Sequence, residues 1–502
     1  MRFRRARLLF ASALLGLFPL AAQEDKGLAA YHAANFEAAL PLLQTAVAKS
    51  PGDANLQAAL LSSLIYEDKV DAASEADEHA AAAFPNSPEV IAARGEFAFY
   101  MGDMPQAEKL FKTAIKLKEA TPRAIFGMSR LYRAASFYRS ARLACLRAHE
   151  IDPDDALITQ TFLRYVPPAK RNELLAPFVA AHPWLYRHYR EYEDSYQAVH
   201  NATEDRPLFV SEGGPQETTL HFFFLMRDAK YARGVGLEFR IGNGRPMRML
   251  FDTGASGILV KQSAVDKAGL EHLGSSAAWG VGDKGTRNMF SSVADSCQVG
   301  TLKFRNCLVR ALEGKRSIAG DEDGLIGADF FQDYVVQIDF QKELLHLKPQ
   351  PPRPANPQGF DRTVPPDEAN FTPVFRFGHM LMISTVVNEK CRGLFLLDTG
   401  AEASGMDAAF ARLSTKVRGN DFARVQGLSG EVKQVYEADR ARLQFGHFMQ
   451  DNVGLTTYNL NNSPEHEDVR MAGILGIPVL SMFRLTIDYR NDLVNFDYVL
   501  KH

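Results

Sequence analysis

The chain has 502 residues, 46% of them hydrophobic and 23% charged, a balance that excludes wholesale disorder and predicts about three domains. Its 57 lysines and arginines against 60 aspartates and glutamates leave a net charge of −3, so charge gives no reason to expect a nucleic-acid partner. The chain has only four cysteines, too few for a disulfide scaffold of this length. None of them lies in a C-x-x-C pair, so a thiolate zinc site has no support.

The first 22 residues have the pattern of a secretory signal peptide. Four arginines between residues 2 and 7 precede an apolar run over residues 8–20, and Ala21-Ala22 then lead into a polar segment. The run has 13 residues, fewer than the ~20 that span a bilayer as a helix. We therefore expect removal of residues 1–22 and a periplasmic or secreted protein with no stable membrane span; an uncleaved anchor is the alternative.

Residues 27–156 carry an internal repeat. Pro51 and Pro85 are one period apart, and Pro153 follows after two further periods. Small side chains at fixed places let paired helices approach closely, and this period and these residue types are similar to four tetratricopeptide (TPR) repeats. A generic alanine-rich helical bundle is the alternative. The alanines that recur at two fixed places are Ala39, Ala73, Ala107 and Ala141, and Ala46, Ala80, Ala114 and Ala148.

A TPR array usually presents a concave face to a segment of another protein. The repeats carry no converging acid, base or nucleophile, so we expect them to bind a protein partner and to carry no chemistry. Cys145 occupies a place that bulky apolar residues hold in other repeats, which predicts a buried structural thiol. Residues 157–227 then predict a connecting segment of one or two helices and a loop.

From residue 228 the pattern changes to short β-rich runs between turn residues, and it occurs twice. Asp252-Thr253-Gly254 follows an apolar run, and Asp398-Thr399-Gly400 repeats this arrangement. An apolar-apolar-Gly element follows each aspartate at a similar interval, ending at Gly327 and at Gly476. We therefore expect a duplicated domain, with lobes at residues 228–348 and 368–502 and a semi-rigid proline-rich linker at residues 349–367.

On these motifs both lobes resemble retropepsin-type aspartic proteases. The resemblance implies small all-β lobes whose site forms where two of them meet. The expected fold class is therefore multidomain, an all-α TPR solenoid followed by two all-β retropepsin-like acid protease domains. The resemblance also implies that Asp252 and Asp398 are the catalytic pair. The residues that would support this pair, by hydrogen bonds across the junction and by tight turns, are Thr253, Thr399, Gly254 and Gly400.

Two neighbouring carboxyl groups suit peptide hydrolysis for a physical reason. Two like charges forced together do not both ionise cheaply, so the pair retains one proton over a wide pH range. The ionised carboxylate takes a proton from water, while the protonated group donates to the carbonyl oxygen of the scissile bond. This chemistry needs no cofactor, and the chain has neither an H-E-x-x-H motif nor clustered histidines for a metal.

Each lobe also has a glycine-bearing segment after its aspartate. Gly280 and Gly282 in the first lobe, and Gly427 and Gly430 in the second, predict mobile hairpin flaps that bind an extended peptide. The first segment matches G-x-G-x-x-G but lacks the strand-to-helix setting of a dinucleotide site. Trp279, beside the first flap, either lines a substrate pocket or is buried in its lobe.

The second lobe departs from the first at two places near the motifs. Glu402 stands where the first lobe has Ser256, which adds a carboxylate near the pair. An acidic residue at this place also occurs in retroviral relatives, so it leaves the resemblance unchanged. Pro478 stands where the first lobe has Asp329, which predicts a change in the local helix.

Two pairings stay open on sequence alone. Cys297 and Cys307 would bridge in an oxidising compartment, but the hairpin expected between them would not place them opposite each other. The two lobes pair either within one chain, as a monomer, or between chains, as a homodimer.

The sequence thus predicts an exported aspartic-type endopeptidase. Water activated between Asp252 and Asp398 would hydrolyse a peptide or protein substrate, and the TPR repeats would bind the substrate or a protein partner. The alternative is a catalytically inactive scaffold whose protease-like lobes only capture peptides, because a fold does not prove turnover.

Overall fold

The computed structural model describes residues 26–186, 189–204, 206–314, 322–351, 356, 359–462 and 469–499. The expected leader, residues 1–22, lies outside them. The chain divides into two compact units: most of residues 1–187 form the first, and residues 188–502 with two short segments form the second. Among the described residues, every helix is too short or too polar to cross a membrane.

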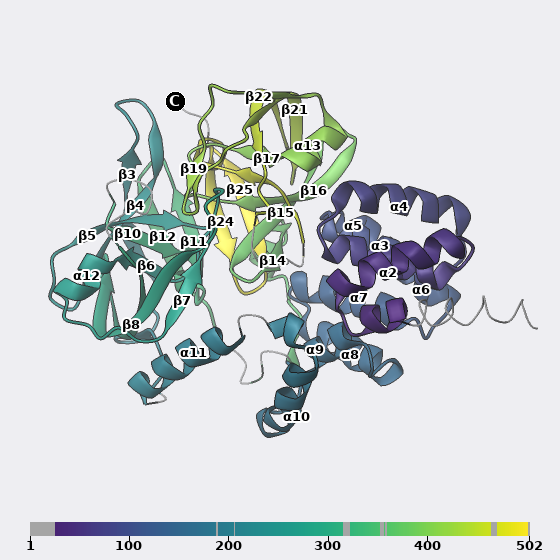
Figure 1. Cartoon of the computed structure of the whole chain (residues 1–502). Helices are drawn as coiled ribbons and strands as arrows, with labels where there is room; N and C mark the ends of the chain where they lie inside the picture. The colour runs from purple at the N-terminus through teal and green to yellow at the C-terminus, as the bar shows by residue number, and fades with distance from the viewer. Residues whose placement is uncertain are drawn as a thin grey trace, which may run out of the picture. The chain divides into compact units, whose positions relative to one another are not determined.

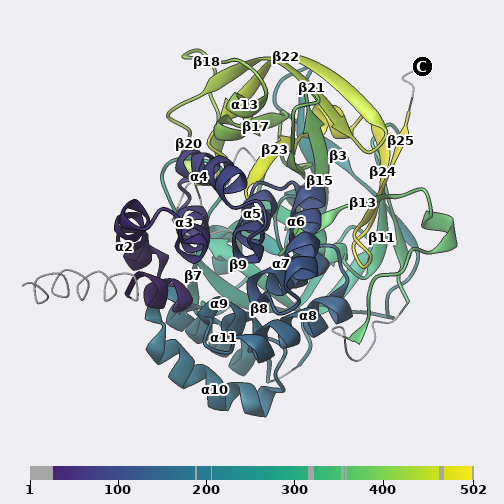
Figure 2. The ribbon, with the colours of Figure 1, turned by 90° about the vertical axis from the view of Figure 1, so that its right-hand side faces the viewer.

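The first unit is a series of helix pairs joined by short turns (Figures 1 and 2). Its helices follow the period of the sequence, which confirms the TPR-like repeats. Helices of 14 residues begin at corresponding places of successive repeats: α2 (Phe36–Lys49), α4 (Val70–Ala83), α6 (Met104–Leu117) and α8 (Tyr138–Ile151). Helices of 13 residues alternate with them at the same interval: α3 (Ala54–Tyr66), α5 (Pro88–Tyr100) and α7 (Pro122–Ala134).

Complementary side-chain sizes hold these helices together. The eight recurring alanines are each at most 2% exposed, as close helix packing requires. Phe111 is fully buried and fills the space above two glycines: an added Cβ would lie 2.6 Å from its ring at Gly95 and 2.3 Å at Gly127. Cys145 is also fully buried, which confirms its structural interpretation.

The segment after the repeats contains more helix than expected. Helices α9 (Ala156–Phe162) and α10 (Pro168–Ala181) and the 3-10 helix η1 (Pro183–Tyr186) extend the first unit. Trp184 Nε1 donates a hydrogen bond of 2.9 Å to the Ala33 carbonyl, so η1 is tied to the start of the helical unit. Helix α11 (Tyr189–Thr203) belongs to the second unit.

The first lobe is all-β. Its sheet order is β1-β9-β6-β10-β5-β4-β8-β7, with β3 paired to β4. Because β8 also pairs with β9, six of these strands close into a ring without free edges. The strands are β1 (Val210–Ser211), β3 (Phe223–Met226), β4 (Ala232–Ile241), β5 (Met247–Asp252), β6 (Ile258–Lys261), β7 (Ser275–Ala278), β8 (Arg287–Val299), β9 (Leu302–Leu312) and β10 (Gly324–Gly327).

The second lobe repeats this topology. Its order is β14-β15-β16-β23-β17-β22-β21-β18, and β15 also pairs with β21, so the same ring closes. The short helix α13 (Ala408–Ser414) takes the place of α12 (Gln262–Lys267) in the first lobe. The strands are β14 (Phe375–Phe377), β15 (Met380–Val387), β16 (Cys391–Leu397), β17 (Gly405–Asp407), β18 (Val417–Gly419), β21 (Tyr436–Phe445), β22 (Phe448–Tyr458) and β23 (Met471–Leu475).

A six-stranded sheet joins the two lobes. At its centre β11 (Tyr334–Asp339) of the first lobe pairs with β24 (Phe483–Asp488) of the second, with Gln337 opposite Thr486. The full order is β13-β25-β24-β11-β12-β2. The lobes therefore pair within one chain. The outer strands are β2 (Thr218–His221), β12 (Leu344–Pro349), β13 (Thr372–Pro373) and β25 (Leu493–Tyr498).

Two details differ from the sequence-based expectations. The first lobe begins before residue 228, because β2 pairs with β12 and β3 pairs with β4. Cys297 and Cys307 form a disulfide across the β8–β9 hairpin. Regular pairing places Cys297 opposite Phe304 and Cys307 opposite Ala294, so the two cysteines are not directly opposite, yet their Cα atoms lie 6.1 Å apart, close enough for the bond.

Candidate active site

The two expected catalytic aspartates end equivalent buried strands. Asp252 is the last residue of β5, which runs parallel to β10 with Phe251 opposite Ile326. Asp398 directly follows β16, which runs parallel to β23 with Leu397 opposite Leu475. These apolar neighbours are fully buried, so the strand ends are firmly anchored where each aspartate enters its loop.

Thr253 and Thr399 connect the two loops. The Thr253 N–H donates to Thr399 Oγ1 at 3.1 Å, and the Thr399 N–H donates to Thr253 Oγ1 at 2.9 Å. Each hydroxyl in turn donates to the carbonyl before the opposite aspartate, Leu397 at 2.7 Å and Phe251 at 2.8 Å. Both threonines are almost fully buried, so the lobes are joined by four mutual hydrogen bonds directly beneath the aspartates.

Gly254 and Gly400 leave room for the carboxyl groups. A Cβ added at Gly254 would lie 2.9 Å from Asp398 Cγ, and one added at Gly400 would lie 2.5 Å from Asp252 Cγ. Any larger residue would therefore push the opposite carboxyl away. The N–H of each glycine also donates at 2.8 Å to the aspartate two residues before it. The six site residues expected at the junction thus come together there.

The carboxyl groups of Asp252 and Asp398 are neighbours at the junction, since each lies against the motif glycine of the other lobe. Burial raises the pKa of Asp252 well above its usual range, and the charge of Asp398 raises it further. Burial also raises the pKa of Asp398, although hydrogen bonds from its neighbours oppose the rise. The pair therefore holds a shared proton at pH values where an exposed aspartate has lost its own.

The two glycine-bearing segments meet as interlocked flaps. The first is the loop between β7 and β8, and the second is the hairpin of β19 (Gln426–Gly427) and β20 (Gly430–Glu431). Ser429 at the tip of the second flap donates its N–H to the Val281 carbonyl at 3.0 Å. Its carbonyl accepts from the Lys284 N–H at 2.8 Å, and its hydroxyl accepts from the Gly280 N–H at 3.1 Å.

Glycine is required for this approach of backbone to backbone. An added Cβ at Gly282 (φ 131°) would lie 2.4 Å from the Gly430 carbonyl oxygen, and one at Gly427 would lie 2.5 Å from the Val281 carbonyl oxygen. The four expected flap glycines thus lie at one flap–flap contact. Trp279 is 38% exposed beside it, so the alternative of full burial is wrong.

Comparison with known proteins finds a family match within the first lobe. Residues 237–330 match the model of the family described as aspartyl protease. The first lobe is similar to an aspartyl protease domain over these residues. We call it and the second lobe, which repeats its topology and its Asp-Thr-Gly turn, the protease lobes. No curated protein matches the chain.

Two solved structures show a partial similarity to the chain. The human IFIT1 dimer with m7Gppp-AAAA is 16% identical, with a TM-score of 0.27, over 39% of this chain and 48% of that one. This chain therefore spans about half the length of that relative. A thermophilic TPR protein of Thermus thermophilus is 15% identical, with a TM-score of 0.25, over 32% of this chain and 98% of that one. These TM-scores are too low to indicate a shared overall fold.

The protease lobes place different side chains at equivalent positions beside the aspartates. Arg233 lies two residues before Val235, which pairs with Phe251, and His379 lies two residues before Leu381 in the equivalent strand. His379 Nε2 lies 3.1 Å from the Gly254 carbonyl oxygen of the other lobe. Its imidazole lowers the pKa of Asp252 and so opposes the effect of burial. Sequence motifs did not identify His379, because it lies outside them and only the strand register brings it to the pair.

Arg233 instead forms an ion pair with Glu402, the additional carboxylate of the second lobe. Its guanidinium binds Glu322 through two hydrogen bonds, and its Nε lies 3.9 Å from Glu402. Glu402 also lies 3.8 Å from Arg227, so two arginines of the first lobe face it. Glu402 thus belongs to an ion-pair network across the lobes and does not join Asp252 and Asp398 as a third acid.

The change from Asp329 to Pro478 alters the loop support as expected. In the first lobe, Asp329 Oδ1 accepts from the Gly257 N–H at 2.8 Å, and residues Ala328–Phe331 form a 3-10 helix. In the second lobe, Ser404 Oγ accepts from the Gly476 N–H at 3.1 Å instead, and α14 (Ile477–Leu480) is α-helical with its proline in the first turn.

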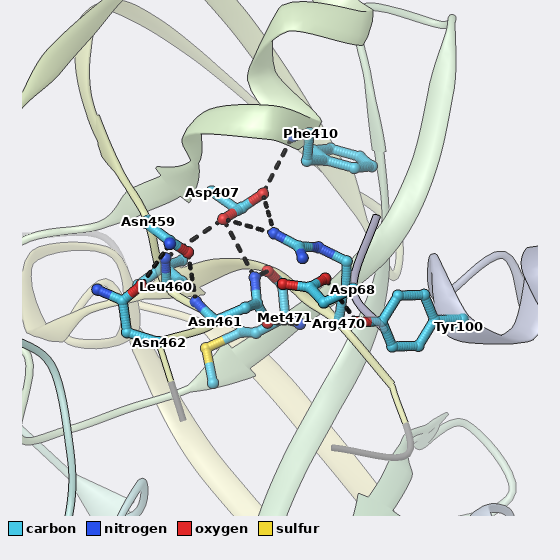
Figure 3. A network of polar contacts seen from close by, with 10 residues as sticks. All are labelled: Asp68, Tyr100, Asp407, Phe410, Asn459, Leu460, Asn461, Asn462, Arg470 and Met471. Carbon is cyan, nitrogen blue, oxygen red and sulfur yellow. Dashed lines mark hydrogen bonds and ion pairs between the residues drawn. The ribbon is translucent and has the colours of Figure 1, made fainter. Parts of the chain in front are cut away.

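A polar network in the second protease lobe centres on the buried carboxylate of Asp407 (Figure 3). Asp407 is 1% exposed and accepts from the Phe410 N–H at 3.1 Å, which caps α13, and from Arg470 at 3.2 Å. Its other oxygen accepts from Asn461 Nδ2 at 3.1 Å. The next residue, Asn462, donates at 2.8 Å to Asp283 in the first flap. This chain of contacts connects α13 to the opposite lobe's flap.

Proposed function

We propose that this protein is an exported aspartic-type endopeptidase that uses Asp252 and Asp398 as one composite site. The observation that carries the proposal is the close approach of these two carboxyl groups, each against the motif glycine of the other lobe, at a junction that four threonine hydrogen bonds hold together. A carboxyl pair with raised pKa values, one member ionised and one protonated, supplies a general base and a general acid at the same place.

The reaction follows from this arrangement. A water molecule between the carboxyl groups gives a proton to the ionised aspartate as its oxygen attacks the peptide carbonyl carbon. The protonated aspartate donates its proton to the carbonyl oxygen, and a neutral gem-diol forms. Return of a proton to the amide nitrogen breaks the C–N bond and releases an amine and a carboxylic acid. The flaps exclude bulk water and align the extended peptide by backbone hydrogen bonds.

The experiment compares the full chain with Asp252→Asn and Asp398→Asn on an unfolded protein substrate over a pH series. Each substitution removes an essential proton carrier, so cleavage falls by at least a factor of about 1,000. Asp421→Asn is the matched control, since this exposed aspartate lies outside both motifs. Cleavage that survives either active-site substitution contradicts a composite site. Peptide binding without cleavage by the unchanged chain supports the peptide-binding scaffold instead.

Export and partner binding belong to the same proposal. The pattern of residues 1–22 and the disulfide Cys297–Cys307 both support an oxidising compartment outside the cytoplasm. The TPR-like repeats support binding of a protein segment, either a substrate or an adaptor. Fractionation of cells that express the full chain tests export, since the mature protein is expected in the periplasm or the medium and about 22 residues shorter than the encoded chain.

A further inference from the structure

An apolar face lies directly beside Asp252, apart from the main core of the first protease lobe. Leu250 is two residues before Asp252 on β5, so both side chains project to the same face of the strand. Leu325 pairs with Leu250, and Leu259 pairs with Leu325, which places three leucines in a row across β5, β10 and β6. The remaining buried members of this cluster are Leu225 and Leu312.

Leu428 of the second flap covers this face. It is half-buried and packs against the leucine cluster, together with Ala255, Ala278 and Met289 of the first lobe. Its Cβ lies 3.0 Å from the position of a Cβ at Gly280. A side chain from one lobe therefore covers an apolar surface of the other, and this surface includes Leu250, two residues before Asp252.

The backbone around Leu428 is also bound as a peptide would be. Its neighbour Ser429 exchanges hydrogen bonds with Val281 and Lys284 through both its N–H and its carbonyl. Main-chain pairing with a flap and a side chain in a pocket are the two elements of extended-peptide recognition. The second flap supplies both elements to the first.

We propose that Leu428 is an internal ligand of the apolar face beside Asp252, and that a peptide substrate must displace it with an aliphatic side chain of its own. This inference rests on the proposed function only for the identity of the ligand as a peptide. Leu428 then affects both the specificity and the affinity of peptide binding. It excludes polar side chains, which cannot offset the cost of its displacement, and it reduces the affinity of every peptide by the free energy of its own contact.

The test measures peptide binding in the full chain with Asp398→Asn, so that cleavage does not consume the probe. Three seven-residue peptides of identical sequence carry Leu, Ala or Asn at the central position. A Trp184→Phe background leaves Trp279, beside the first flap, as the single tryptophan reporter. The variants compared are Leu428→Ala and, as a matched control, Leu413→Ala, an exposed leucine (50%) of the same lobe.

Removal of the internal ligand is expected to tighten binding of the Leu peptide by about tenfold, the value of a half-buried leucine contact. Binding of the Asn peptide stays weak, and Leu413→Ala changes neither. A second variant, Gly282→Ala, separates the flaps without changing Leu428, because its Cβ would clash with Gly430. It is expected to tighten Leu-peptide binding as well.

Weaker binding of the Leu peptide by Leu428→Ala overturns the inference, because it makes Leu428 a latch that closes over substrate. Equal binding of all three peptides, or of none, by Leu428→Ala overturns it too. Tightened binding in the Asp398→Asn background, combined with no cleavage by the unsubstituted chain, supports the inference while it contradicts the proposed endopeptidase activity.

Discussion

Thr253 and Thr399 bind each other across the lobes through reciprocal N–H to hydroxyl hydrogen bonds of 3.1 and 2.9 Å. Each threonine belongs to one copy of a duplicated motif, and neither can complete its hydrogen bonds without the other copy. The pair of aspartates above them, Asp252 and Asp398, therefore depends on the pairing of the lobes, and each lobe alone supplies half of the candidate site.

Thr399→Ala is expected to reduce both stability and activity. It removes the hydroxyl that accepts from the Thr253 N–H and donates to the Phe251 carbonyl, and leaves both buried groups without a partner. The free energy of unfolding should fall by ~2–4 kcal/mol, at ~1–2 kcal/mol for each unpaired group. Thr399→Ser keeps the hydroxyl and is the control. Urea unfolding and kcat/KM measure the two effects; an alanine variant as active as the serine variant contradicts the coupling.

The raised pKa values of Asp252 and Asp398 predict that this pair of carboxyl groups lowers the stability of the fold at neutral pH. A carboxyl group whose pKa is raised in the folded state stabilises the fold below its unfolded pKa, and this contribution is lost as the pH rises through the folded pKa. At neutral pH, above the unfolded pKa, the pair therefore lowers the stability of the fold. Asp252→Asn should abolish cleavage and raise the Tm at pH 7, with a smaller gain at pH 4, as measured by calorimetry. A lower Tm at pH 7 would show that the pair stabilises the fold.

The same pair predicts a bell-shaped dependence of kcat/KM on pH. Activity requires one proton on the pair, so it falls when both groups are protonated and when both are ionised. Since both pKa values are raised, the alkaline limb should lie well above the usual pKa of an aspartate, 3.8. An initial-rate series across the pH range measures it. An alkaline limb near 4 would contradict the shared proton.

His379→Leu is expected to lower kcat and shift this alkaline limb upward. It removes the hydrogen bond to the Gly254 carbonyl, worth about fivefold in rate. It also removes the imidazole that lowers the pKa of Asp252. His379→Gln keeps a donor and should restore kcat without restoring the limb. His447→Leu, at an exposed turn of the same lobe, is the control. If glutamine restores nothing, the hydrogen bond is not what positions the loop.

Glu368 predicts a separate pH effect on stability. It is 6% exposed, and burial together with the neighbouring Asp488 carboxylate raises its pKa from 4.5 to about 8. The stability it contributes is complete below about pH 4.5 and is lost as the pH rises toward 8. Glu368→Gln should therefore flatten the fall in Tm across this window. Glu217→Gln, at an exposed glutamate, is the control, and an unchanged slope in the Glu368→Gln variant would contradict the assignment.

Local patterns in the sequence determined much of this architecture. The repeat period predicted where helices begin, because small side chains must recur wherever helices pack closely. The two Asp-Thr-Gly motifs indicated which residues meet at the junction, because turn geometry and charge are encoded within a few consecutive residues. The alternation of the β-rich segments predicted all-β lobes.

Tertiary structure decided what depends on contacts between distant segments. Only the pairing of β11 with β24 places both lobes in one molecule, and no local pattern specifies which strands meet across about 150 residues. The same is true of the Cys297–Cys307 bond, of His379 beside Gly254, and of Leu428 on the leucine face of the opposite lobe. Composition indicated an ordinary chain of about three domains. The tertiary structure shows that two of them, each a closed ring of strands, are joined by a shared sheet and form one candidate site between them.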